Sequence, residues 1–144
     1  MEANMTQKTT ISNQKPLCFI LANGLTNGGV TTWAINASRR MVVKGQPCAI
    51  IAHEPEPGND VFPRSDQDWI VECAGNASSR LPKPKEIAAF ARCYASLGDA
   101  ILLPNWSWGT WVGVAAMMRN PKPHNRVIGI AHTDDKAYYD IMTY

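Results

Sequence analysis

A short apolar run that leads through a glycine-bearing turn into a helix constrains the fold of this chain most. Residues 17–22 are all apolar, Gly28 and Gly29 are adjacent in the turn, and helical spacing of apolar residues begins at Val30. An apolar run of this length is typical of a strand that is covered on both faces. Two glycines ahead of a helix leave backbone N–H groups open to an anion. The stretch predicts a strand, an oxyanion-binding turn and a helix.

Strand and helix patterns alternate along the rest of the chain. The expected elements are strands at residues 47–52, 68–74, 100–104 and 127–131, and helices at 84–97, 108–119 and from 136. The strand at 68–74 has an imperfect alternation, which indicates an edge position. Buried strands separated by helices favour a parallel sheet with helices on both faces. We therefore expect an α/β fold with a doubly wound, mostly parallel sheet.

Helical periodicity also predicts which residues face the sheet. For the first helix these are Val30, Trp33, Ala34, Ala37 and Met41. For the helix at 84–97 they are Ile87, Phe90, Ala91, Tyr94 and Ala95. For the helix at 108–119 they are Trp111, Val112, Ala115 and Met118.

Composition limits the classes of protein that this chain can belong to. Its 144 residues, 45% of them hydrophobic, fit one soluble globular domain, expected at 16–144 behind a disordered polar leader at 1–15. Fourteen basic and 12 acidic side chains are mixed along the chain without a basic block. This pattern gives no footprint for nucleic acid. Neither a signal peptide nor a transmembrane segment is visible, so a cytoplasmic location is expected.

The cysteines and the known catalytic motifs exclude several kinds of chemistry. No C-x-x-C, H-E-x-x-H or Ser-His-Asp pattern is present, so zinc and hydrolase interpretations have no support and no metal is expected. The four cysteines are interpreted as small buried hydrophobes in a reducing compartment: Cys18, Cys48, Cys73 and Cys93.

Several polar and aromatic residues follow the expected strands, where ligands of doubly wound sheets bind. The oxyanion turn is assigned to Asn27, Gly28, Gly29 and Val30. The residues expected to line a cleft beside it are His53, Asn105, Trp106 and Trp108. His132 ends the last strand, where an imidazole can bind a substrate hydroxyl or transfer a proton.

A plainer interpretation stays open for each of these candidates. The turn is neither the G-x-G-x-x-G fingerprint nor a P-loop, so its glycines can also serve tight packing alone. His53 and His132 can be structural hydrogen bonders. Trp106 and Trp108 can belong to the core as well as to a cleft wall.

Two segments resemble family 4 glycosyltransferases. Asn27-Gly28-Gly29-Val30-Thr31-Thr32-Trp33, followed by a helix with two arginines and by Lys44-Gly45, resembles the opening of these enzymes. Val127-Ile128-Gly129-Ile130-Ala131-His132 resembles the family's strand-then-histidine segment. The resemblance implies a Rossmann-like N-terminal domain of a two-domain GT-B enzyme that transfers sugar from a nucleotide-sugar donor to an acceptor with retention. It implies no metal or other cofactor.

The resemblance also implies roles for individual residues and for a second domain. Gly28 and Gly29 would lie near the donor phosphates, and His132 would contact the transferred sugar. In this family most of the nucleotide binds to a C-terminal domain with a Glu-x7-Glu motif, so the chain is expected to be the acceptor-side domain alone and inactive by itself. From the residues alone, two alternatives remain: a non-catalytic α/β module that binds a phosphorylated or nucleotide ligand, and a structural fragment with an empty cleft. The sugar, the base, the acceptor and the oligomeric state are not indicated.

Overall fold

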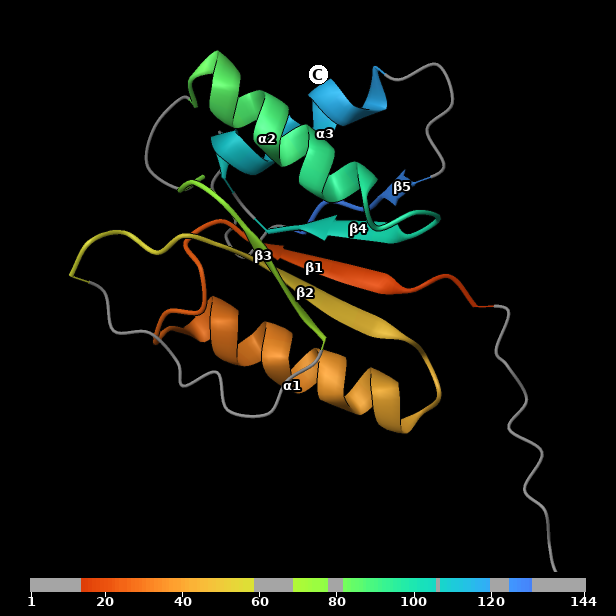
Figure 1. The fold of residues 1–144 in the computed structure, drawn as a ribbon. Coiled ribbons are helices and arrows are strands. Elements are labelled where there is room, and N and C mark those ends of the chain that lie inside the picture. The colour runs from red at the N-terminus through yellow and green to blue at the C-terminus, as the bar shows by residue number, and fades with distance from the viewer. Residues whose placement is uncertain (1–13, 59–68, 78–81, 106, 120–124, 131–144) are drawn as a thin grey trace, which may run out of the picture.

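Parallel strands lie side by side in the order β3-β2-β1-β4-β5 (Figure 1). Their bounds are β1 Leu17–Leu21, β2 Cys48–His53, β3 Ile70–Cys73, β4 Ile101–Pro104 and β5 Arg126–Val127. The computed structural model describes residues 14–58, 69–77, 82–105, 107–119 and 125–130. The order is that of a Rossmann-type sheet, whose winding direction reverses between β1 and β4. The predicted α/β fold with a parallel sheet is confirmed.

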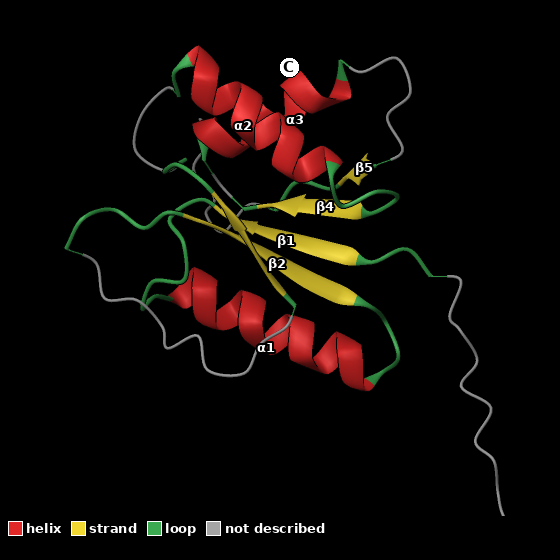
Figure 2. Ribbon diagram, in the orientation of Figure 1, coloured by secondary structure: helices red, strands yellow, loops and turns green. Residues whose placement is uncertain are grey.

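Helices of the described residues cover both faces of this sheet (Figure 2). The helix α1 (Gly29–Val43) packs on one face, and α2 (Pro84–Ala95) and α3 (Trp108–Met118) pack on the other. The strand β1 serves both layers because successive side chains point to opposite faces. Phe19 belongs to the core on the α1 side, whereas Cys18 and Ile20 belong to the core on the α2 and α3 side.

The buried face of α1 differs from the predicted one. The buried residues are Thr31, Ala34, Ile35 and Ser38. Trp33 and Met41, which were expected to face the sheet, are each 40% exposed. Small side chains let the helix approach the sheet closely, and the Ser38 hydroxyl is satisfied by donating to the Ile35 carbonyl at 2.9 Å. Trp33 instead packs at the edge of the core between α1 and the sheet, with its ring edge-on to Phe19 at 5.5 Å between centroids.

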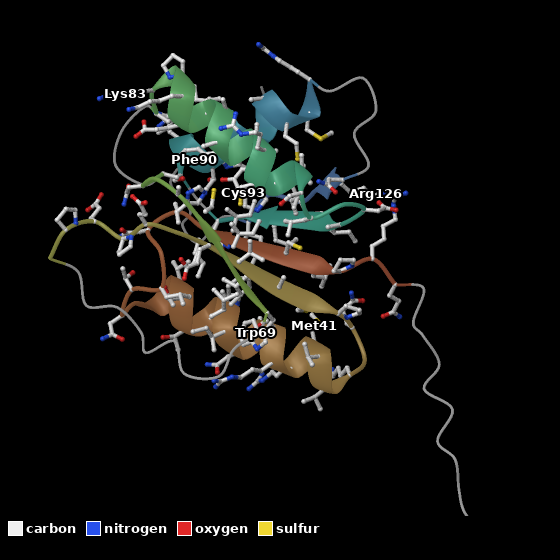
Figure 3. All side chains as sticks on the ribbon, viewed as in Figure 1. Met41, Trp69, Lys83, Phe90, Cys93 and Arg126 are labelled. Atoms are coloured by element: carbon white, nitrogen blue, oxygen red, sulfur yellow. The ribbon has the colours of Figure 1, made fainter. Side chains whose placement is uncertain are left out.

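The predicted face of α3 is wrong for the same reason. The buried residues are Gly109, Thr110, Gly113, Val114 and Met117, whereas Ala115 and Met118 are exposed. A Cβ atom added at Gly113 would lie 2.7 Å from the Cβ of Phe90. The glycine therefore lets α3 pack directly against α2. On α2, Phe90 and Tyr94 are buried as predicted, and Figure 3 labels Phe90 on this helix.

The remaining predicted elements agree closely or lie outside the described residues. The strand β3 pairs only with β2 in the described part of the chain, which fits the expected edge position. The last strand is shorter than predicted, but a single parallel bridge joins Asn105 to Ile130 beyond it. The expected helix from 136 and most of the expected leader, residues 1–13, are not described. Lys15, at the end of that leader, forms an ion pair with Asp99 at 2.6 Å.

Candidate functional site

A pocket of about 260 Å³ opens at the point where the winding of the sheet reverses. It is lined by Leu21, Ala22, Asn23, Gly24, Thr26, Gly28, Gly29, Val30, Thr31 and Asn105. These residues come from the end of β1, from the turn into α1, and from the position after β4. Doubly wound sheets bind their ligands at this place. The structure therefore places the predicted turn in the pocket.

The start of α1 presents unbonded donors to this pocket. Gly28 is the N-cap residue in an extended conformation, with φ of −174°, and no side chain caps the helix. The first bond of the helix runs from the Thr32 N–H to the Gly28 carbonyl at 3.0 Å. Among the described residues, the N–H groups of residues 29–31 have no acceptor. The first turn contains no acidic side chain, so α1 itself carries no negative charge that offsets the positive end of its dipole.

The glycines of the turn fall into two kinds. Gly24 is required by the fold: its φ is +63°, and an added Cβ would lie 2.5 Å from the carbonyl oxygen of His53. At Gly28 and Gly29 an added Cβ would meet nothing within 4 Å, and neither residue has a positive φ. The tight-packing interpretation therefore applies to Gly24 and not to the pair that precedes the helix.

Asn23 ties together the loops that follow three strands. Its Oδ1 atom accepts hydrogen bonds from the Glu56 N–H at 2.8 Å and from the Asn76 amide at 3.4 Å. Asn76 also donates to the carbonyl of Glu54 at 2.9 Å. The ends of β1, β2 and β3 are thereby fixed relative to one another. The sequence placed Asn23 at the end of the first strand, but neither Asn23 nor Thr31 was among the predicted binding residues, although an asparagine directly after a buried strand was an available signal.

Asn105 lines the pocket, as predicted, and also holds its two sides together. The residue is 2% exposed. Its Nδ2 atom donates to the carbonyl oxygens of Ile20 at 3.1 Å and of Leu103 at 3.2 Å, and its backbone N–H also donates to Ile20. Because these contacts join β4 to β1, Asn105 sets the width of the pocket at the reversal point.

His53 does not line the pocket, contrary to the prediction. It is 1% exposed and packs with its ring edge-on to Phe90 at 4.5 Å. Its Nδ1 atom lies 2.9 Å from the carbonyl of Gly75, and its Nε2 atom lies 2.7 Å from the hydroxyl of Tyr94. Burial lowers the pKa of His53 to about 4. The side chain is a neutral core residue because partners from the loop after β3 and from α2 enclose it.

The other predicted site residues are placed as follows. Gly28, Gly29 and Val30 line the pocket, whereas Asn27 is exposed beside it and is not part of the lining. Trp108 begins α3, is 52% exposed and also lies outside the lining. Trp106 and His132 lie outside the described residues.

The described ranges contain neither a metal-binding cluster nor a membrane-spanning helix. In the part of the chain that the structure describes, no group of three or more His, Cys, Asp or Glu side chains is arranged to hold a metal ion. Within the same ranges, no helix has the length and apolarity needed to cross a membrane. None of the four cysteines forms a disulfide.

Comparisons with known proteins do not assign the chain to a family. No protein-family model, no curated protein and no solved structure matches it. The fold and the geometry of the pocket are therefore the findings on which a function must rest.

Proposed function

We propose that this chain is the acceptor-side domain of a glycosyltransferase that moves a sugar from a nucleotide-sugar donor to an acceptor with retention. The observation that carries the proposal is the open space in front of Gly28 and Gly29. Neither residue is needed for packing or for a left-handed conformation, and both line a pocket at the reversal point of the sheet. A backbone without side chains permits the close approach of a phosphate.

The start of α1 suits the chemistry of this transfer. When the sugar leaves its donor, negative charge develops on the departing nucleoside diphosphate, and oriented N–H donors stabilise such charge. The unbonded N–H groups at the start of α1 are donors of this kind. The proposal includes a second domain that holds most of the nucleotide, a cytoplasmic location, and His132 as the residue that contacts the sugar. The four free cysteines fit a reducing compartment.

A titration followed by amide NMR tests the donor site. UDP-glucose and GDP-mannose are added separately to the isotope-labelled chain, and we expect shifts confined to residues 22–32, to residue 105 and to the surroundings of His132, the proposed sugar contact. Gly29→Ala, which places a methyl group in the open space, should abolish these shifts while the rest of the spectrum is preserved. Thr32→Ala is the matched control because Thr32 is exposed and outside the pocket lining. An absence of shifts with both sugar nucleotides would contradict the proposal.

A second test concerns turnover. Because the second domain holds most of the nucleotide, we expect the 144-residue chain alone to neither hydrolyse nor transfer sugar from these donors. Robust release of free UDP or GDP by the purified chain would disprove the acceptor-side assignment, whatever the binding result.

One observation favours a non-catalytic binding module as the second candidate. The lining residues of the pocket carry no titratable side chain, so the described part of the site contains no general acid or base. A module of this kind would bind a phosphorylated ligand without turning it over. Addition of the proposed second domain separates the two candidates, since only a glycosyltransferase domain gains transfer activity from it.

A further inference from the structure

Thr31 brings an unpaired hydroxyl to the pocket. The residue is 4% exposed and lines the pocket, and no described group forms a hydrogen bond with its side chain. In the described ranges, every fully buried side-chain oxygen and nitrogen has a hydrogen-bond partner. The Thr31 hydroxyl is therefore not sealed in the core, and its remaining accessible surface faces the pocket that the residue lines. A nearly buried hydroxyl in this position is ready to bond a ligand.

Asn23 brings a second donor to the pocket, and its contacts establish which end of its side-chain amide is the nitrogen. Its Oδ1 atom accepts from a backbone N–H, that of Glu56, and a backbone N–H can only donate. This contact settles which end of the amide is oxygen, and hence that Nδ2 is the other end. The Nδ2 group has no described partner, while the residue lines the pocket. Its two N–H bonds are directed by the same contact that fixes the loop after β2.

The donors reach the pocket from two directions, and no carboxylate among the described lining residues competes with a ligand for them. Thr31 and the backbone N–H groups of residues 29–31 belong to α1, whereas Asn23 lies in the turn that follows β1. No carboxylate is among the lining residues that the structure describes, so this part of the pocket lacks the acidic side chains with which proteins usually hold Mg²⁺. A tetrahedral phosphoryl group has enough oxygens to accept from both directions at once.

We propose that Asn23 and Thr31 are the side-chain ligands of a phosphoryl oxyanion in this pocket and select it without a metal ion. The assignment of that oxyanion to a sugar donor rests on the proposed function, but binding of a phosphoryl group does not. Asn105 is not a ligand in this arrangement, because its amide nitrogen already donates to two backbone carbonyls. Thr31 forms no contact that holds the strands, and an Asn23→Asp substitution keeps the Oδ1 acceptor through which Asn23 holds the loops after the strands.

The test measures the affinity of the chain for inorganic phosphate by amide NMR in the presence of EDTA. Thr31→Val keeps the shape of the side chain and removes the hydroxyl, and we expect affinity to fall about tenfold. Asn23→Asp keeps the acceptor for the Glu56 N–H but replaces the donor with a negative charge, and binding should be lost. Thr32→Val is the control. Thr32 is the next residue along α1 and is exposed, so this variant should bind phosphate as the wild type does. Preserved amide spectra show that each variant is folded.

Two results would overturn the inference: no phosphate binding by the wild-type chain, or unchanged affinity in both Thr31→Val and Asn23→Asp. A parallel titration with UDP-glucose separates this failure from a failure of the proposed function. Equal shifts at residues 28–31 in the wild type and in both variants remove Asn23 and Thr31 as ligands and leave the sugar-nucleotide site intact. Phosphate binding that depends on both residues, without binding of any sugar nucleotide, retains the inference and rejects the glycosyltransferase.

Discussion

The Nε2 atom of His53 accepts a hydrogen bond from the hydroxyl of Tyr94 at 2.7 Å, across the core between β2 and α2. The acceptor role follows from the other ring nitrogen, because Nδ1 must donate its proton to the carbonyl of Gly75. One neutral tautomer satisfies both contacts. Protonation of the ring would place a second N–H against the hydroxyl and a charge in the core.

The neutral state of His53 predicts acid sensitivity. Burial lowers its pKa from 6.5 to about 4, so the unfolded chain binds the proton more tightly than the folded chain. The contribution of His53 to stability is complete above pH 6.5 and is lost as the pH falls toward 4. We expect the free energy of unfolding to drop by about 2 kcal/mol between pH 7 and pH 5.

Urea denaturation at several pH values measures this drop. His53→Gln supplies the comparison, because its side chain does not titrate: the variant should be less stable at pH 7 but should lose less between pH 7 and pH 5. Equal losses in the two proteins would assign the acid sensitivity to other groups.

The two kinds of glycine in the turn predict opposite results for alanine substitution. Gly24→Ala places a Cβ 2.5 Å from a backbone oxygen at a positive φ, so we expect a loss of at least about 2 kcal/mol of stability. Gly29→Ala meets no neighbour and gains helix propensity, so stability should stay within about 1 kcal/mol of the wild type. Thermal or urea unfolding of both variants checks the contrast. A comparable loss at Gly29 would mean that the fold itself needs this glycine.

The close approach of α3 to α2 depends on Gly113. A Cβ at this position would lie 2.7 Å from the Cβ of Phe90, an atom that cannot move without its helix. We expect Gly113→Ala to destabilise the protein by about 1–3 kcal/mol through overpacking. Ala115→Leu, on the exposed side of the same helix, is the control and should be nearly neutral. Equal stability of the two variants would show that the helices can separate at little cost.

Hydrophobic patterning predicted the strands and their alternation with helices, but it did not predict which faces of α1 and α3 are buried. The run that forms β1 is apolar throughout, so a strand buried on both faces was the natural interpretation. Thr31 and Ser38 on α1 and Gly113 on α3 are buried because small side chains permit close packing, and a count of apolar residues gives them no weight. A Gly-x-x-x-Gly spacing in α3 was the signal that such a count overlooks.

The site was predicted in part for a similar reason. The turn was found because local glycines and a helix start are visible in a few consecutive residues. The burial of His53 depends on Gly75 and Tyr94, which lie far along the chain, so its own surroundings in sequence indicated a loop. The donors of Asn23 and Thr31 became apparent only when the contacts of their neighbours were known.

Cys73 and Cys93 predict a difference in thiol reactivity. The interaction with the neighbouring Cys73 thiol lowers the pKa of Cys93, whereas the same interaction, together with burial, raises the pKa of Cys73. Cys93 is half-buried on α2 (Figure 3) and Cys73 is only 3% exposed. Because the thiolate is the nucleophile, iodoacetamide at neutral pH should modify Cys93 before Cys73. Peptide mass spectrometry at increasing reaction times gives the order. In Cys73→Ala the neighbouring thiol is gone, so alkylation of Cys93 should slow; an unchanged rate would show that Cys73 does not activate its neighbour.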